Sequence, residues 1–246
     1  MRVFKIPESI ERPSAALPEP AKLSLRAVTL LEVASVVFTV LITAWVIMPL
    51  RLGNWWMESL PGLLALLMMF NSHRLRGETP RQLGFTPEHF GRACRLLIGP
   101  MIVALAIVLL IGRALGSLHF TAHFPASFFG RAAWGLVQQY ILQAFIFRRL
   151  RSALTSEGEA ETQPSLRLPI LTTALLFALV HAPNLPLMLL TFASALLWTR
   201  VYSRAPNLPA LALSHGLLSA VTAMSLPDWM LRGMIVGLRH LVYQAF

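Results

Sequence analysis

Long apolar stretches separated by short polar or proline-containing segments dominate the hydrophobic pattern of this chain. A helix needs about 20 largely apolar residues to cross the ~30 Å hydrocarbon core of a bilayer. Eight stretches reach or approach that length, at about 27–50, 56–72, 94–117, 128–150, 168–183, 184–203, 206–225 and 228–245. The second, fifth and last are short or interrupted. The pattern predicts an all-α, polytopic transmembrane helix bundle of about eight spans.

The composition of the chain indicates that lipid is its solvent. Of its 246 residues, 56% are hydrophobic and 13% are charged, and the mean hydropathy is +0.63. Soluble domains carry about 25% charged residues. We expect an N-terminal arm over residues 1–26 and one transmembrane bundle over 27–246. The arm holds four prolines and lacks the pattern of a secretory signal, so we expect it to lie in the cytoplasm.

The formal net charge of +10 arises largely from arginines that flank the apolar stretches. This placement indicates membrane orientation and contact with anionic lipid headgroups, and it does not resemble the basic stripe of a nucleic-acid-binding protein. With the arm inside, the predicted cytoplasmic segments hold 17 Lys and Arg residues and the outside segments hold 4. The positive-inside rule then predicts that both termini are cytoplasmic, which agrees with an even number of spans.

Polar side chains recur inside three of the predicted spans, where their cost marks them as candidate functional residues. At a helical rise of ~1.5 Å per residue, Gln139, His215 and His181 lie roughly 13, 12 and 18 Å from the cytoplasmic edge. We therefore expect an intramembrane cavity that faces the cytoplasm. Its predicted lining is Gln138, Gln139, Gln143, His181, His215 and Ser219.

Helical spacing supports the same site. Gln139 and Gln143 are four residues apart, as are His215 and Ser219, so each pair shares a helix face. Phe177 precedes His181 by four residues and is expected to wall the cavity. Such residues also form ordinary interhelical hydrogen bonds, worth about 0.6 kcal/mol on average. Their common depth favours a site, and two histidines without a nearby carboxylate fall short of a metal centre, so we expect no metal or cofactor.

Three of these segments resemble motifs of the CAAX-protease and bacteriocin-processing family of intramembrane endopeptidases. QQYILQAFIFRRL, from residue 138, is similar to the family pattern EExxFRG and its apolar and basic tail. FALVH, at 177–181, matches FxxxH, and HGLLS, at 215–219, matches HxxxN except at the last position. RQLGFTPEHF, at 81–90, is similar to the segment that precedes the family core. The resemblance covers about residues 80–225.

The departures from the family pattern fall on the residues that the resemblance makes catalytic. In the family, the glutamate pair is thought to activate the attacking water, with the histidines and the asparagine assisting. The matching residues here are Gln138 and Gln139 for the glutamates, Gln143 for the arginine, and Ser219 for the asparagine. A carboxylate can take a proton from water, whereas a neutral amide cannot. Two negative charges and one positive charge are absent together, which indicates a coordinated change to a neutral site.

Three functions remain open from the sequence. The chain is a non-catalytic homologue that binds a peptide, a lipid or a lipidated partner through Gln138, Gln139, Gln143, Phe177 and Ser219. Alternatively, it is an active endopeptidase in which His181 or His215 serves as general base and a neutral Gln or Ser219 steadies an oxyanion. The third possibility is a structural or assembly subunit of a membrane complex. Since the family is widespread in bacteria, we expect a bacterial inner membrane.

Overall fold

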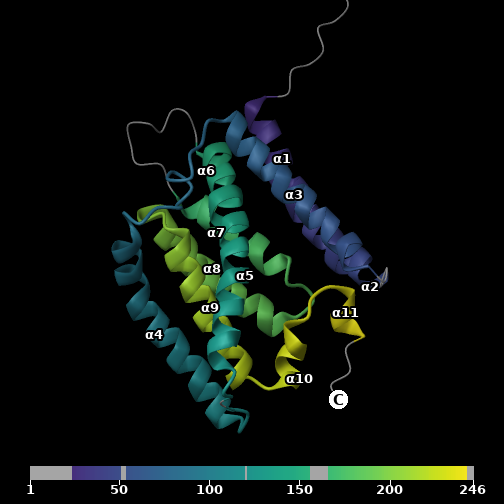
Figure 1. Cartoon of the computed structure of the whole chain (residues 1–246), viewed down its shortest axis with the longest axis vertical. Coiled ribbons are helices and arrows are strands. Elements are labelled where there is room, and N and C mark those ends of the chain that lie inside the picture. Colours follow the sequence, from purple (N-terminus) through teal and green to yellow (C-terminus); the bar gives the residue numbers. More distant parts are fainter. Residues whose placement is uncertain (1–23, 51–53, 120, 156–165, 243–246) are drawn as a thin grey trace, which may run out of the picture.

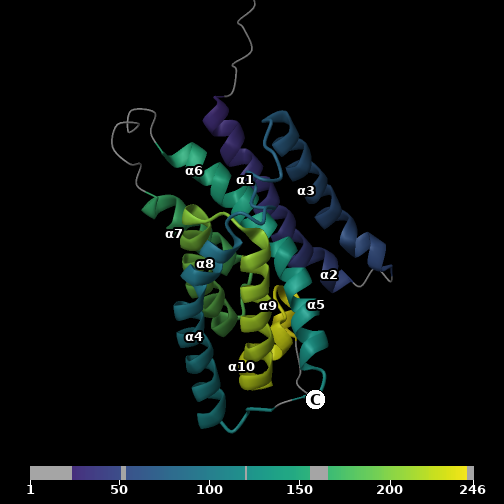
Figure 2. The same ribbon diagram turned by 60° about the vertical axis from the view of Figure 1, so that its left-hand side comes forward.

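The computed structural model of this protein describes residues 24–50, 54–119, 121–155 and 166–242 (Figure 1). Helices joined by turns make up these residues, and no strand occurs in this described part of the chain. The prediction of an all-α fold is confirmed for these ranges. The long helices lie side by side along the long axis of the molecule (Figures 1 and 2).

The helices begin and end close to the predicted stretches. The first is α1 (Leu25–Ile42), which continues through the π-helix η1 (Thr43–Ile47) and α2 (Met48–Leu50). It is followed by α3 (Trp55–Leu75) and α4 (Phe90–Ala114). The next helix is also composite, with α5 (Phe124–Gln139), the π-helix η2 (Tyr140–Phe147) and α6 (Arg148–Leu154). The remaining elements are α7 (Arg167–Leu179), α8 (Leu185–Arg204), α9 (Leu208–Ser225), α10 (Asp228–Leu231), the 3-10 helix η4 (Arg232–Met234) and α11 (Leu238–Leu241).

Four of these helices are long and apolar enough to cross a membrane, which makes the chain an integral membrane protein. They cover Leu25–Leu50, Phe90–Ala114, Leu185–Arg204 and Leu208–Ser225. Helix α7 is apolar but has 13 residues, a rise of about 20 Å, which is short of the hydrocarbon thickness. Helices α3 and α5–α6 coincide with two further predicted stretches without meeting the same criterion. The sequence predicts eight spans. Four helices of the described structure meet the criterion for a span.

The predicted eighth span, at about 228–245, is wrong for the residues described up to 242. Helices α10, η4 and α11 have four, three and four residues. Arg232, Gly233 and Met234 all have positive φ angles, of 47°, 61° and 58°, so a right-handed helix cannot continue through them. Mean hydropathy over a window does not detect such a turn.

This broken segment changes where the described chain ends. Helix α11 contacts η1 and α2, at the opposite end of the first span from Leu25 (Figures 1 and 2). The Gly237 N–H donates to the Ala182 carbonyl at 2.8 Å and holds the segment there. The predicted position of both termini on one side depended on an even number of spans. Residues 25 and 241 lie at opposite ends of the bundle, but the termini themselves fall outside the described residues, so their cytoplasmic position stays a prediction.

A buried ionic cluster joins α1, α3 and α6 at the end where α1 begins. Arg149 is 2% exposed and pairs with Glu78 at 2.7 Å and with Glu32 at 3.4 Å, and Arg76 pairs with Glu32 at 2.6 Å. Burial by itself would raise the pKa of Glu78. Hydrogen bonds from His73, Arg149 and Arg148 outweigh that effect and hold this pKa well below its ordinary value. Glu78 therefore remains ionised, and its ion pairs with Arg148 and Arg149 hold α6, at the C-terminal end of the helix that carries the glutamines.

Small residues allow α5 and α9 to approach closely, antiparallel to each other. An added Cβ on Gly216 would lie 2.7 Å from the Cα of Ala132, and one on Gly135 would lie 3.1 Å from the ring of His215. The N-terminus of α9 is fixed by Asn207, whose side-chain oxygen accepts the N–H of Ala210 at 2.9 Å. This packing places the histidine of α9 beside the glutamines of α5.

Candidate functional site

The centre of the candidate site is a contact between Gln139 and His215. Gln139 is the last residue of α5 and is fully buried at 0% exposure. Its side-chain nitrogen lies 3.4 Å from Nδ1 of His215, on the facing turn of α9. In this arrangement the amide N–H donates and the imidazole accepts, so the His215 proton belongs on Nε2. Two residues predicted at the same depth are thus in direct contact.

Aromatic rings enclose His215 on two sides and connect it to His181. The ring of Trp198, from α8, stacks on His215 at 4.7 Å with an interplanar angle of 11°. The ring centroid of Phe177, from α7, lies 6.4 Å from that of His215 and 4.8 Å from that of His181, with the rings edge-on in both pairs. The ring of Phe177 therefore lies close to both histidine rings, and its role as the wall of a cavity stays a prediction.

His181 lies in the turn that joins α7 to α8, just beyond the end of α7 at Leu179. Its Nδ1 is 2.6 Å from the carbonyl oxygen of Phe177, to which it donates. In the neutral ring this bond leaves the proton on Nδ1 and a lone pair on Nε2. His181 is thus held in an orientation in which Nε2 can accept a hydrogen bond.

Several buried polar atoms on the helices that carry this contact and on α8 have no hydrogen-bond partner in the described structure. They are Oε1 of Gln139, both side-chain amide atoms of Gln143, Nε1 of Trp198 and Oγ1 of Thr199. Gln143 lies in η2, about one turn beyond Gln139, and is also 0% exposed. A buried polar group without a partner costs about 1–3 kcal/mol. π-Helical segments such as η2 occur frequently at functional sites.

Ser219 and Gln138 are placed differently from the rest of the predicted site. Ser219 lies one turn beyond His215 on α9, and its hydroxyl accepts a hydrogen bond from Nη1 of Arg131 at 3.0 Å. Gln138 is partly buried, and as the neighbour of Gln139 it points to a different side of the helix. The structure therefore brings together Gln139, His215, Phe177 and His181, and it directs Ser219 toward Arg131.

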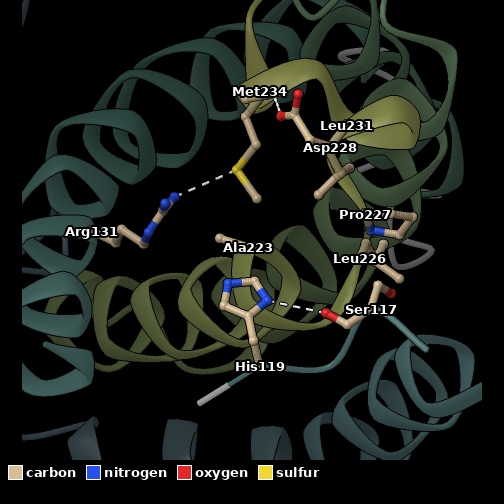
Figure 3. A pocket seen from close by; sticks show the side chains of 10 residues that line it. Ser117, His119, Arg131, Ala223, Leu226, Pro227, Asp228, Leu231 and Met234 are labelled. Carbon is tan, nitrogen blue, oxygen red and sulfur yellow. Dashed lines mark hydrogen bonds between the residues drawn. The ribbon is translucent and has the colours of Figure 1, made fainter. Parts of the chain in front are cut away.

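Two cavities in the molecule lie elsewhere. One, of about 460 Å³, is lined by Ser117, His119, Arg131 and residues between Ala223 in α9 and Met234 in η4 (Figure 3). The other, of about 520 Å³, is lined by Phe85, Thr86, Pro87, Phe90 and Pro209. Neither is lined by any of the six residues predicted to form a cytoplasm-facing cavity. At the glutamine–histidine site, the rings of Trp198 and Phe177 lie beside His215.

Sequence reasoning missed two residues, Trp198 and Arg131. Trp198 lies in an apolar span with no motif that singles it out, so only its stacking on His215 identifies it. Arg131 falls inside the predicted span at 128–150 but was counted only as an outside charge. A charged residue inside a span was the signal that could have found it. No three His, Cys, Asp or Glu side chains within the described ranges are grouped so that they could hold a metal.

The helical bundle therefore brings together residues from the segments whose motifs resemble the CAAX-protease family. Residues 135–221 match the family model of the type II CAAX prenyl endopeptidase Rce1-like proteins. The matched segment runs from Gly135 in α5 to Val221 in α9, and over this segment the chain is similar to the CAAX-protease family. The match confirms the resemblance found from the motifs. No curated protein and no solved structure matched the chain.

Proposed function

We propose that this protein is a non-catalytic CAAX-protease-like membrane protein that binds a peptide or a lipid-modified partner at the glutamine–histidine site. The observation that carries the proposal is the contact of the fully buried Gln139 amide with His215 at 3.4 Å. Gln139 stands where the family has a catalytic glutamate. Activation of water requires a base at that position, and a carboxamide is not one.

The chemistry of the remaining groups suits binding. The amide atoms of Gln139 and Gln143 that lack protein partners include both donors and acceptors. A peptide backbone presents the complementary N–H and C=O groups. Neutral amides also cost less to desolvate than the carboxylates of an active protease. A peptide segment bound between Phe177 and Trp198 would satisfy these atoms, and it would require the two rings to move apart.

Hydrolysis is the second candidate, and one observation favours it. The bond from His181 Nδ1 to the Phe177 carbonyl leaves Nε2 as a possible general base. In that mechanism Nε2 takes a proton from water as the oxygen attacks a peptide carbonyl, and a glutamine N–H stabilises the resulting oxyanion. The third candidate, a structural subunit, would use the same polar residues only for helix packing.

The proposed location is a bacterial inner membrane, with the ionic cluster toward the cytoplasm. Of the 16 arginines in the described ranges, 12 lie at the end of the bundle that holds the cluster. The other four are Arg113, Arg131, Arg232 and Arg239. This asymmetry supports the orientation through the positive-inside rule.

The proposal is tested by comparing membranes from cells that carry the intact protein, His181→Ala, or the control His123→Ala at matched expression. His123 lies at the start of α5, outside the site. We expect identical peptide termini in all three membranes. We also expect the His181→Ala protein to retain about tenfold less of its chemically crosslinked partner than the other two, as loss of one buried contact implies.

A peptide terminus present with the intact protein and with His123→Ala, but absent with His181→Ala, would show cleavage and overturn the binding proposal. Equal partner retention by all three proteins would instead favour the structural subunit. Quantitative mass spectrometry of peptide termini and of crosslinked partners measures both outcomes.

A further inference from the structure

The cavity of about 460 Å³ lies at the opposite end of the bundle from the ionic cluster. Arg131 projects into it from α5, facing the α9–α10 turn and η4, while Ser117 and His119 line another side (Figure 3). Its volume is within the range of small-molecule sites, which are about 300–1,000 Å³. None of the catalytic-motif positions of the family contributes to its lining.

Arg131 carries a positive charge into this cavity and meets neutral acceptors in the described structure. Its Nε donates to the hydroxyl of Ser127 at 3.2 Å, and its Nη1 donates to that of Ser219 at 3.0 Å. Nη1 also lies 3.4 Å from the sulfur of Met234. A thioether is a weak acceptor, whereas a guanidinium matches the paired oxygens of a carboxylate or phosphate. An oxyanion would therefore be a much better partner on the Met234 side.

The acidic residue of the cavity is engaged elsewhere. One carboxylate oxygen of Asp228 accepts the N–H of Gly233 at 2.8 Å. Figure 3 shows the Asp228 carboxylate against the η4 backbone, while the Arg131 guanidinium points to the Met234 sulfur. Met234 itself has a φ angle of 58°, a left-handed conformation that is costly for a side chain of its size. An unfavourable backbone thus places a weak acceptor against the arginine.

The surroundings of the cavity indicate the source of the oxyanion. Trp229, beside Asp228, is 68% exposed, and Trp55 and Trp56 at the start of α3 are 80% and 53% exposed at the same end of the bundle. Tryptophans gather at the membrane–water interface, at the level of the lipid headgroups. Phospholipid phosphates lie at that level.

We propose that the Arg131 cavity is a binding site for a phosphate oxyanion, supplied by a phospholipid headgroup. Free inorganic phosphate has the same chemistry and is separated from the lipid by the test below. Arg131 holds the phosphate oxygens, and Met234 moves aside. The hydrogen bond from Arg131 to Ser219 links this site to the turn of α9 that follows His215, although the inference does not depend on the function of the glutamine–histidine site.

The test uses the full-length protein, purified in detergent, stripped of lipid and titrated with phosphatidylglycerol. Native mass spectrometry measures the bound lipid. We expect Arg131→Gln to weaken binding about tenfold, as loss of a charged contact implies. Arg131→Lys should restore part of it. Arg113→Gln is the matched control, because Arg113 is an exposed arginine near the same end of the bundle that does not line the cavity. We expect it to bind as the wild type does.

A second variant keeps the proposal testable if Arg131→Gln does not fold. Ala223 lines the cavity, so Ala223→Leu fills it without altering a charge, and it should weaken binding to a similar extent. Gel filtration and the melting temperature check that each variant is folded. Equal lipid binding by the wild type and both cavity variants would overturn the proposal, as would equal binding of diacylglycerol, which has no phosphate. Displacement of the lipid by millimolar inorganic phosphate would overturn its assignment to a headgroup and leave a free-phosphate site.

Discussion

At the scale of single residues, the neutrality of the buried site is its main physical property. Gln139 and Gln143 are both fully buried in the segment that resembles the charged motif EExxFRG. An isolated charge at such a depth is costly, whereas a neutral amide without a partner costs about 1–3 kcal/mol. Two neutral amides at these positions avoid the larger cost. The present residues thus form a set, and changing one of them alone should be unfavourable.

A double-mutant cycle tests this interdependence. Gln139→Glu and Gln143→Arg should each lower the free energy of unfolding by about 3–5 kcal/mol, because each buries a charge without a counterion. Together they should cost less than their sum by about 1–3 kcal/mol, since the two charges lie within one turn. Denaturant unfolding in detergent measures these values. Strict additivity would show that the two side chains do not interact.

At the scale of elements, the site depends on how closely α5 and α9 approach. Glycine in a helix costs about 1 kcal/mol relative to alanine, so a glycine at a helix contact needs a packing reason. Gly216 has one, since the backbone and side chain of Ala132 fill the space where its Cβ would lie. The contact between Gln139 and His215 requires the same short separation of the two helices.

Gly216→Ala should therefore separate α5 from α9 and lower the free energy of unfolding by about 1–3 kcal/mol. Gly130→Ala is the matched control, because no atom lies within 4 Å of its would-be Cβ. That change should stabilise the protein by about 0.5–1 kcal/mol. Thermal unfolding of the purified proteins compares the two. A stabilising effect of Gly216→Ala would contradict the observed packing.

At the scale of the whole molecule, the two ends of the bundle differ in charge. One end holds the ionic cluster and most of the described arginines, and the other holds the Arg131 cavity and the exposed tryptophans. The position of α11 beside η1 assigns Arg239 to the second end. This arrangement predicts which loops face the cytoplasm.

Cysteine accessibility in intact cells tests that orientation. In a Cys94→Ser background, Asn54→Cys and Arg239→Cys should react with a membrane-impermeant maleimide, because both positions are exposed at the end with few arginines. Glu88→Cys, which is exposed at the opposite end, should react only after the membrane is permeabilised. If only Glu88→Cys were labelled in intact cells, the orientation would be the reverse of the one proposed. If Arg239→Cys and Glu88→Cys were both labelled, the position of α11 would be contradicted.

The amino-acid pattern was sufficient to predict that this protein is a helical membrane protein and to locate the segment that matches the family model. An apolar run in lipid predicts a helix, because each membrane-spanning segment must satisfy its own backbone N–H and C=O groups. Hydropathy gave a wrong prediction of a span at residues 228–242, because residues 232–234 have left-handed backbone angles that interrupt the helix. Equal depth along two helices was enough to anticipate that Gln139 and His215 meet.

The tertiary structure alone decided what surrounds that contact. Depth does not specify how a helix is rotated about its axis, so the sequence did not reveal that Trp198 stacks on His215 or that Ser219 bonds to Arg131. It also did not reveal the cavity that Arg131 lines. Side-chain contacts between helices depend on packing among residues far apart in the chain, and no single segment encodes them.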